Sequence, residues 1–194
     1  MNKAERTKQF IIEKTAPIFN KKGYAGTSLS DMTDATGLTK GSIYGNFADK
    51  DEVAVAAFDH NIRLLQHSTR LEMAKHATAR GKLLAMIDVY YTAQKIGVPE
   101  GGCPIMNTTV EADDTHPRLK AKVSEVMLDW KNMVAKVIEG GAAKKEFRGP
   151  VDAEQTALTL IALIEGAILI RRATDKTGYY RQVLETARKL VNEL

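Results

Sequence analysis

Cysteine, proline and aromatic residues are scarce in this sequence of 194 residues, with one cysteine, five prolines and 6% aromatics. A single cysteine excludes an internal disulfide scaffold and a multi-cysteine zinc site, and is typical of the reducing cytosol. The charged first ten residues lack the apolar core of a secretory signal peptide. The most apolar stretch, residues 157–170, is expected to be too short to span a bilayer. We therefore expect a cytoplasmic protein without a membrane partner.

Strand-like alternation and metal-ligand spacing are both absent from the sequence. No long stretch alternates apolar and polar residues as a half-buried strand would. The four histidines, at 60, 67, 76 and 116, are scattered and form no His-Glu-x-x-His pattern. His60 and His67 share one face of a predicted helix, which is more typical of a solvated or packed face. We expect no metal site and no cofactor.

Helical spacing of apolar residues recurs along the chain and predicts an all-α fold of about nine helices. A content of 44% hydrophobic and 27% charged residues excludes a disordered chain, and the length suits one large or two small domains. The predicted helices cover residues 4–22, 28–35, 39–45, 49–74, 79–96, 103–113, 117–143, 152–173 and 178–193.

Glycine, proline and aspartate mark several helix ends. Gly23 is predicted to end the first helix in a left-handed conformation. Pro104 suits the first position of a helix and places Cys103 at its N-cap. Asp152, three residues before Gln155, resembles a capping box.

Residues 28–35 and 39–45, joined by a turn that contains Gly37, have the spacing of a helix-turn-helix, whose second helix enters the DNA major groove. Helices this short are unstable alone, so apolar side chains must hold them against the first helix. The candidates for this packing are Leu29, Met32, Leu38, Ile43 and Phe47. The side chains then left for contact with a ligand are Lys40, Gly41, Ser42, Tyr44 and Asn46.

The positive charge is concentrated near the same motif. Residues 1–50 contain eight basic and five acidic side chains, whereas the whole chain has a net charge of +4. Most of the excess therefore lies in the first quarter of the sequence, where it favours contact with a polyanion.

The run from Thr27 to Val53, TSLSDMTDATGLTKGSIYGNFADKDEV, resembles the DNA-binding domain of TetR-family transcriptional regulators. The matching features are Gly26-Thr27, the turn from Gly37 to Gly41, the Ile43-Tyr44 pair, Phe47, and Lys50 followed by an acidic residue. The resemblance covers about residues 6–55. It implies a homodimeric, non-enzymatic protein with a three-helix DNA-binding domain over residues 1–48 and a C-terminal ligand-binding and dimerisation domain over residues 49–194.

The resemblance also implies which residues meet double-stranded DNA. It places on the DNA face Thr39, Lys40, Gly41, Ser42, Tyr44 and Asn46. Tyr44 and Lys50 match positions that hold phosphates in the family, although Tyr44 can also be a core aromatic and Lys50 a solvated helix cap. Asn46 stands where histidine is frequent. Ser28 and Ser30 are further candidates that can equally be helix caps.

The segment Gly101-Gly102-Cys103-Pro104-Ile105-Met106-Asn107 resembles the start of a central helix in a TetR subgroup, some of whose members sense electrophiles or oxidants through a cysteine. A thiol at a helix N-terminus can have a lowered pKa, which favours the reactive thiolate. The alternative is a small buried side chain that lines a pocket. The candidates for contact with a small-molecule effector are Tyr91, Cys103, Met106, Asn107, Met127 and Trp130, although such soft and aromatic residues are often core.

The segment 157–170 has almost no polar face, so it must be covered on most sides. The cover is either the rest of a monomer or a second copy, and we favour a dimer built from two helices of each chain. The predicted interface residues are Leu160, Ile161, Ile164, Ile168, Tyr180, Leu184, Ala187 and Val191.

The sequence therefore favours a repressor that binds a palindromic operator as a homodimer and is released by a small molecule or an electrophile. A helical-bundle enzyme with Cys103 as nucleophile and His116 as base is an alternative, but no third orienting group is evident. A helical adaptor that does not bind DNA is another. The enzyme alternative leaves the helix-turn-helix unexplained, and binding to duplex DNA would separate the repressor from both alternatives.

Overall fold

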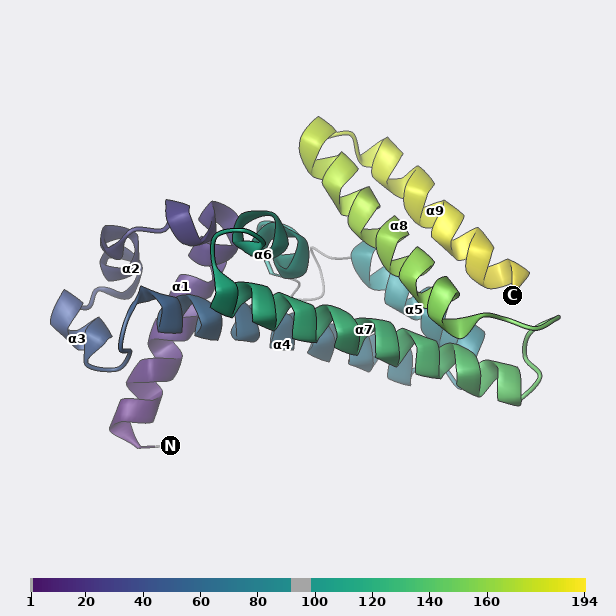
Figure 1. Cartoon of the computed structure of the whole chain (residues 1–194), viewed down its shortest axis with the longest axis horizontal. Coiled ribbons are helices and arrows are strands. Elements are labelled where there is room, and N and C mark those ends of the chain that lie inside the picture. The colour runs from purple at the N-terminus through teal and green to yellow at the C-terminus, as the bar shows by residue number, and fades with distance from the viewer. Residues whose placement is uncertain (1, 92–98) are drawn as a thin grey trace. The chain divides into compact units, whose positions relative to one another are not determined.

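The structure, a computed structural model, describes residues 2–91 and 99–194. Over these residues the chain forms nine α-helices and no strand, which confirms the predicted fold class (Figure 1). The helices are α1 (Lys3–Gly26), α2 (Leu29–Thr36), α3 (Lys40–Tyr44), α4 (Lys50–Ala74), α5 (Ala79–Tyr91), α6 (Pro104–Ala112), α7 (Pro117–Ala143), α8 (Ala153–Thr174) and α9 (Thr177–Glu193). The predicted continuation of α5 over residues 92–96 lies outside the described residues.

The chain divides into two compact units, each built from two separate stretches of sequence. The first unit comprises Met1–Leu65 and Pro99–Ser124, and the second comprises Gln66–Val98 and Glu125–Leu194. Helix α6 therefore belongs to the same unit as α1, α2 and α3. The boundaries between these units fall within α4 and α7. The predicted division into a DNA-binding domain over residues 1–48 and a ligand-binding domain over residues 49–194 therefore stays a prediction.

The core of the first unit holds α2 and α3 against α1 and the start of α4. Met32 and Ile43 are fully buried and Phe47 is 2% exposed, in one cluster with Ile11 of α1 and Val53 of α4. Leu29 and Leu38 are partly buried against the same cluster, so all five predicted packing residues contribute. This packing stabilises two helices that are too short to persist alone.

Helix α1 is interrupted near its C-terminus. Gly23 has φ +74° and ψ 179°, and a further helical turn follows over residues 24–26. Gly23 therefore has a positive φ, as predicted, but its ψ is not that of a left-handed cap, and the helix resumes after it instead of ending there. The hydroxyl of Thr27 donates to the Gly23 carbonyl over 2.7 Å, which joins the two sides of the break.

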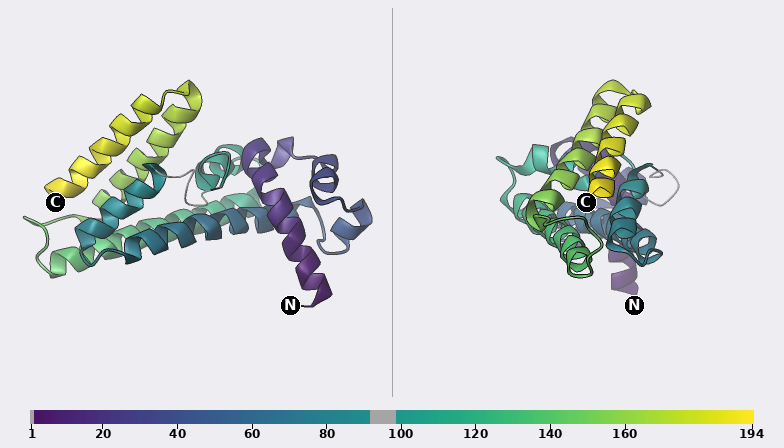
Figure 2. Two further views of the ribbon diagram at one scale, coloured as in Figure 1. Left: turned by 180° about the vertical axis from the view of Figure 1, so that it is seen from behind. Right: turned by 90° about the vertical axis from the view of Figure 1, so that its right-hand side faces the viewer.

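The second unit is organised around the hairpin of α8 and α9, which lie side by side in opposite directions (Figures 1 and 2). Helix α5 packs against α9. Leu83, Leu160, Ile164 and Leu184 are completely buried in this unit. Asp152 caps α8 as predicted, because its carboxylate accepts a hydrogen bond of 2.9 Å from the Gln155 amide.

Helix α8 is longer than the apolar stretch that predicted it. It runs for 22 residues and is long and apolar enough, by length and composition, to cross a membrane. The expectation that this segment is too short was therefore wrong, because the helix extends beyond residues 157–170 at both ends. A packed core helix meets the same criteria, and six residues of α8 are buried within the chain.

Candidate nucleic-acid interface

Side-chain caps and one left-handed glycine define the helix-turn-helix. Ser28 caps α2 in a reciprocal box, in which its hydroxyl oxygen accepts from the Asp31 amide and the Asp31 carboxylate accepts from the Ser28 amide. Gly37 ends α2 with φ +67°. Thr39 caps α3 by accepting a hydrogen bond of 3.2 Å from the Ser42 amide. Ser28 thus has the capping role that the sequence left open.

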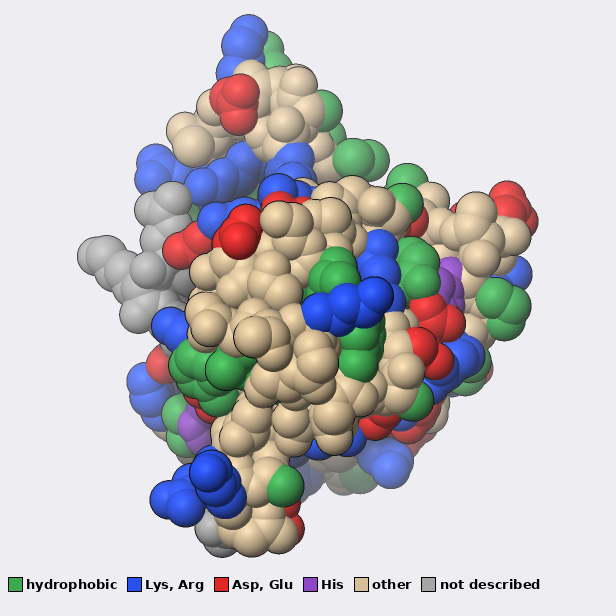
Figure 3. Space-filling view, turned by 90° about the vertical axis from the view of Figure 1, so that its left-hand side faces the viewer, with side chains coloured by type: hydrophobic (Ala, Val, Ile, Leu, Met, Phe, Trp, Pro, Cys, Tyr) green, Lys and Arg blue, Asp and Glu red, His purple; other side chains and the backbone are tan. Residues whose placement is uncertain are grey.

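Helix α3 buries one face and exposes the other. Ile43 is completely buried, whereas Thr39, Lys40 and Gly41 are exposed and Ser42 is half-buried. Figure 3 views the molecule from the side where α2 and α3 lie, and the middle of this face consists mainly of backbone and uncharged polar side chains, with lysine and arginine side chains among them. Such a face can approach a nucleic-acid backbone closely.

Three of the predicted DNA contacts are partly engaged within the chain. The amide group of Asn46 donates to the Ser42 carbonyl over 2.8 Å, which helps to close the end of α3. Tyr44 packs partly against the buried core cluster, and its side chain is half-buried. The hydroxyl of Ser30 donates to Asp34 over 3.3 Å and remains exposed.

Lys50 is positioned by an aromatic ring at the start of α4. Its Nζ atom lies 4.4 Å from the ring centroid of Tyr24. The Tyr24 hydroxyl donates to Asp51, which raises the pKa of Tyr24 to about 12. The same hydrogen bond, followed by His116 and Arg118, lowers the pKa of Asp51. The lysine therefore rests on a ring that is itself held in place.

Ion pairs engage some of the basic side chains of the first unit. Lys8 pairs with Glu52 over 2.8 Å, and Lys22 pairs with Asp31 over 2.6 Å. The Lys22 contact is the main reason why the pKa of Asp31 lies below its ordinary value. Lys40 is exposed and forms no ion pair with the described residues, so its charge is available to a phosphate.

The Gly-Cys-Pro-x-x-Asn motif connects α6 to α1. The Asn107 amide group donates to the carbonyl oxygens of Asn20 and Gly101, each over 2.9 Å, and the Asn20 amide group donates to the Gly102 carbonyl over 3.1 Å. Cys103 is the N-cap residue of α6 and is 3% exposed. These asparagine contacts hold the loop before α6 against α1.

A small cavity of about 20 Å³ lies between α1, α4, α6 and the start of α7. Its lining includes Phe19, Tyr24, Phe58, Asn61, Asn107 and Glu111. This volume suits about one water molecule and is too small for a metabolite.

The six predicted effector contacts are divided between the two units. Cys103, Met106 and Asn107 lie in the first unit, whereas Tyr91, Met127 and Trp130 lie in the second. The Tyr91 hydroxyl donates to the Arg181 carbonyl over 3.1 Å. The Trp130 ring stacks on Tyr90 with 6.4 Å between centroids. An effector role for these residues stays a prediction.

The residues predicted for the dimer interface are buried within one chain. Leu160, Ile161, Ile164, Ile168, Tyr180, Leu184, Ala187 and Val191 all lie in the core of the second unit. The apolar side chains that α8 exposes are different: Leu158 is 51% and Leu169 is 56% exposed, and Ala162 lies exposed between them in sequence. A buried side chain has little surface to offer to another protein, so the predicted interface residues are engaged in the core of their own unit.

Several structurally important contacts had no signal in the sequence. The Glu111 carboxylate accepts from the backbone amides of Tyr24 and Ala25. His116 directly precedes Pro117 and caps α7 by accepting from the Leu119 amide over 3.2 Å, as a proline at the first helical position indicates. The edge-on contact of its ring with Tyr24, at 4.5 Å, had no such local signal. The Glu111 and Tyr24 partners are far apart in sequence, so local spacing does not reveal them. Within the described residues, no group of three potential metal ligands occurs.

Comparison with known proteins agrees with this architecture, which is that of a helical regulator with an N-terminal helix-turn-helix. The family model for bacterial regulatory proteins of the tetR family matches residues 11–57, and the model for the tetracyclin repressor-like C-terminal domain matches residues 79–187. The chain belongs to the TetR family of transcriptional regulators.

Two solved structures of the family resemble the whole chain. A TetR-family regulator from Cytophaga hutchinsonii is 46% identical, with a TM-score of 0.94, over 100% of this chain and 97% of that one. A TetR regulator from Chloroflexus aurantiacus is 34% identical, with a TM-score of 0.92, over 100% and 98%. Both likenesses extend through the two units.

More distant relatives include regulators with individual names. TtgR of Pseudomonas putida is 26% identical over 175 residues, which are 87% of this chain and 80% of TtgR. The transcriptional repressor DhaR of a Mycobacterium species is 27% identical over 164 residues, which are 84% and 80% of the two chains. Regulators of this family bind DNA, typically act as dimers with small-molecule effectors, and are generally not enzymes.

Proposed function

We propose that this protein is a cytoplasmic repressor that binds a palindromic operator as a homodimer and is released by a small-molecule effector. The observation that carries the proposal is helix α3, where Ile43 is buried while Thr39, Lys40 and Gly41 are exposed on the other side. The repressor DhaR among the relatives supports repression as the outcome of DNA binding.

Two recognition helices, one from each copy, would enter successive major grooves. Dimeric helix-turn-helix proteins place these helices about 34–36 Å apart, so the operator should be an inverted repeat with one helical turn between half-site centres. We propose that Lys40 and Lys50 contact phosphates. We also propose that Tyr44 and Asn46 contact DNA at the same surface through those polar atoms that are not engaged within the chain.

The second copy would dock on the exposed face of α8. Leu158, Ala162 and Leu169 follow one another at spacings of four and seven residues, so they lie along one side of the helix. Burial of this stripe against the same stripe of a partner gives an isologous contact with twofold symmetry.

A reversibly bound small molecule is the effector that the structure favours. Release by an electrophile would require a reagent to reach the thiol of Cys103, which is 3% exposed. The Gly-Cys-Pro-x-x-Asn segment is also committed to contacts with α1 through Asn107. We therefore propose that this motif joins α6 to α1, and that a reversible ligand controls DNA binding.

The salt dependence of DNA binding tests the proposal. DNA fragments selected by the protein from a random pool serve as the operator, and affinity is measured by fluorescence anisotropy at several salt concentrations. Lys40→Ala should reduce the slope of log K against log salt by about one unit, because one phosphate contact is lost. Lys189→Ala, which removes an exposed lysine from α9, should leave the slope unchanged.

Two results would contradict the proposal at different levels. If the wild-type protein selects no DNA at low salt, the protein does not act as proposed. If Lys40→Ala retains the wild-type slope, Lys40 does not contact a phosphate. Lys50→Ala should also reduce the slope by about one unit if Lys50 meets a phosphate.

A further inference from the structure

The direction in which the chain enters the helix-turn-helix is decided at the break in α1. Gly23 leaves the helical conformation, with φ +74°, and a new helical turn begins at Tyr24. The first amides of a helical turn have no acceptor within the helix itself. The amides of Tyr24 and Ala25 therefore need an acceptor from elsewhere in the chain.

Glu111 of α6 supplies this acceptor. One of its carboxylate oxygens accepts from the Tyr24 amide over 2.6 Å, and the other accepts from the Ala25 amide over 2.7 Å. A carboxylate is favoured at the start of a helical turn, because it meets the positive end of the peptide dipoles. Since both oxygens are used, the carboxylate fixes the position and the orientation of this turn together.

Gly23 makes room for the carboxylate. A Cβ atom at residue 23 would lie 2.8 Å from Cδ of Glu111 and would overlap one of its oxygens. The positive φ of Gly23 also disfavours any residue with a side chain. Glycine is therefore required here both by the backbone conformation and by the contact with Glu111.

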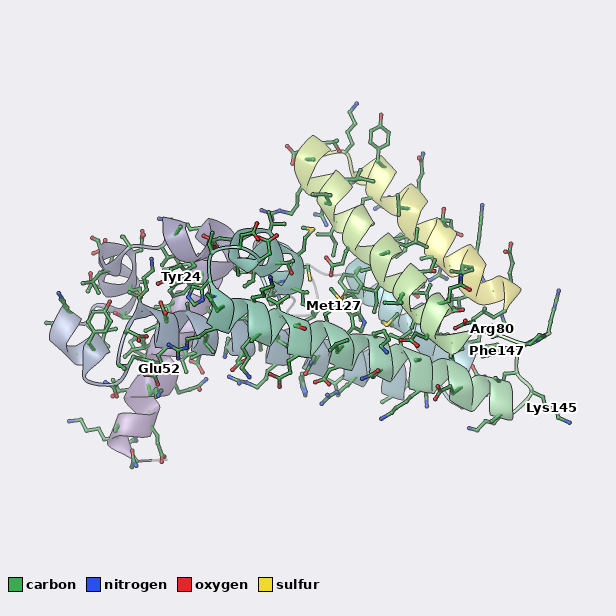
Figure 4. All side chains as sticks on the ribbon, in the orientation of Figure 1. Tyr24, Glu52, Arg80, Met127, Lys145 and Phe147 are labelled. Carbon is green, nitrogen blue, oxygen red and sulfur yellow. The ribbon has the colours of Figure 1, made fainter. Side chains whose placement is uncertain are left out.

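Neighbouring contacts hold the same part of α1. Asn107, one turn before Glu111 on α6, donates to the Asn20 carbonyl. The side chain of Tyr24, labelled in Figure 4, lies against His116 and donates to Asp51 of α4. The break in α1 is thus held by contacts with α6, with α4 and with His116, the residue that caps α7. This break lies only a few residues before Ser28, the N-cap residue of α2.

We propose that Glu111 is a positioning residue for DNA binding. Through the amides of Tyr24 and Ala25 it fixes the direction in which α1 leads into α2 and α3, and hence the angle at which α3 meets DNA. The inference rests on the proposed function, because two copies of α3 must match two half-sites at once. A change of angle then weakens binding to the full operator but not to one half-site.

The test compares two DNA targets and three variants. The targets are the palindrome selected by the wild-type protein and a single half-site in unrelated flanking sequence. Glu111→Gln keeps the shape of the side chain but replaces one acceptor oxygen by a donor. Asp113→Asn removes the same charge from an exposed residue at the end of α6 and is the matched control. Gly23→Ala disrupts the same contact from the side of α1.

We expect Glu111→Gln and Gly23→Ala to lose about tenfold or more in affinity for the palindrome, about 1.4 kcal/mol, with less than about a twofold change for the half-site. Both variants should also discriminate less between palindromes whose spacer differs by one base pair. Asp113→Asn should bind both targets as the wild type does. An unchanged half-site affinity shows that the helix-turn-helix is still folded.

The outcomes separate the inference from the proposed function. Wild-type affinity of Glu111→Gln for the palindrome overturns the positioning role. A parallel loss on palindrome and half-site overturns it as well, because Glu111 would then only stabilise the fold. If the wild-type protein itself binds both targets equally, the dimeric function fails and the inference fails with it.

Discussion

Gly41 is one of the helical glycines for which the packing within the chain gives no reason. It lies in α3 with an ordinary φ, and a Cβ atom there would meet nothing closer than the Thr39 hydroxyl at 4.0 Å. Glycine in a helix costs stability relative to alanine, because the unfolded chain has more freedom to lose. We propose that a close approach of DNA to this surface is the reason for glycine at position 41, since the contacts within the chain do not require it.

Gly41→Ala should therefore change stability and DNA binding in opposite directions. We expect the variant to be more stable by about 0.4–1 kcal/mol and to melt about 1–4 °C higher, while its affinity for the selected operator decreases. Differential scanning fluorimetry and fluorescence anisotropy measure the two effects. Gly178→Ala, at an open position in α9, should leave DNA binding unchanged. Wild-type DNA affinity of Gly41→Ala would remove Gly41 from the interface.

At the scale of elements, Asp51 of α4 joins three helices. It accepts from the Tyr24 hydroxyl of α1, and it lies 3.5 Å from Nε2 of His116 and 4.0 Å from Arg118 of α7. These contacts lower the pKa of Asp51, the Tyr24 hydrogen bond most of all. A folded-state pKa below the unfolded value means that the ionised carboxylate stabilises the fold above about pH 4, and that this contribution is lost as the pH falls further.

Asp51→Asn should therefore be less stable than the wild type at pH 7, with a difference that narrows below about pH 4. We expect about 1 kcal/mol at neutral pH, the typical net value of a hydrogen bond, since the side chain is 35% exposed and solvent weakens its ion pairs. Urea unfolding at a series of pH values measures the difference. Asp34→Asn, on the exposed side of α2, is the control. A difference that stays constant from pH 7 to pH 3 would contradict the role of Asp51.

At the scale of the whole molecule, we propose that the apolar stripe of Leu158, Ala162 and Leu169 on α8 joins two copies of the chain, so that two copies of α3 can act together. Leu158 and Leu169 are both more than half exposed on a helix whose other apolar residues largely form the core. Burial of a leucine side chain contributes about 1.5–3 kcal/mol, so a symmetric contact that covers two from each chain has a substantial driving force.

Leu169→Glu should convert the proposed dimer into a monomer, because it places a charge in the apolar contact between the two copies. It should also abolish tight binding to the palindrome, because a monomer contacts only one half-site at a time. Analytical ultracentrifugation gives the mass, and anisotropy gives the affinity. Leu71→Glu, at a leucine of α4 that is 53% exposed, is the control and should remain dimeric. A dimeric Leu169→Glu protein would show that the copies meet through another face.

Local features of the fold were predictable because their causes lie within a few residues. The positive φ of Gly23, the Cys103 position at the start of α6 and the Asp152 cap each follow from backbone preference or from one nearby hydrogen bond, although the helical turn after Gly23 was not predicted. The packing of Met32 and Ile43 followed from helical spacing alone. Helical spacing is not sufficient for α8. Because this helix is apolar on nearly all sides, its sequence does not show which side packs against the rest of the same chain.

The sequence by itself determined the helical class, most helix ends and which side of α3 is exposed, because short-range sterics and periodicity control them. Only the tertiary structure decided that α6 belongs with the DNA-reading helices, that Leu158 and Leu169 are the uncovered leucines of α8, and that Glu111 holds the break in α1. The Glu111 contact joins residues 87 positions apart. Contacts of this kind depend on how whole helices pack against one another, so no local pattern in the sequence predicts them.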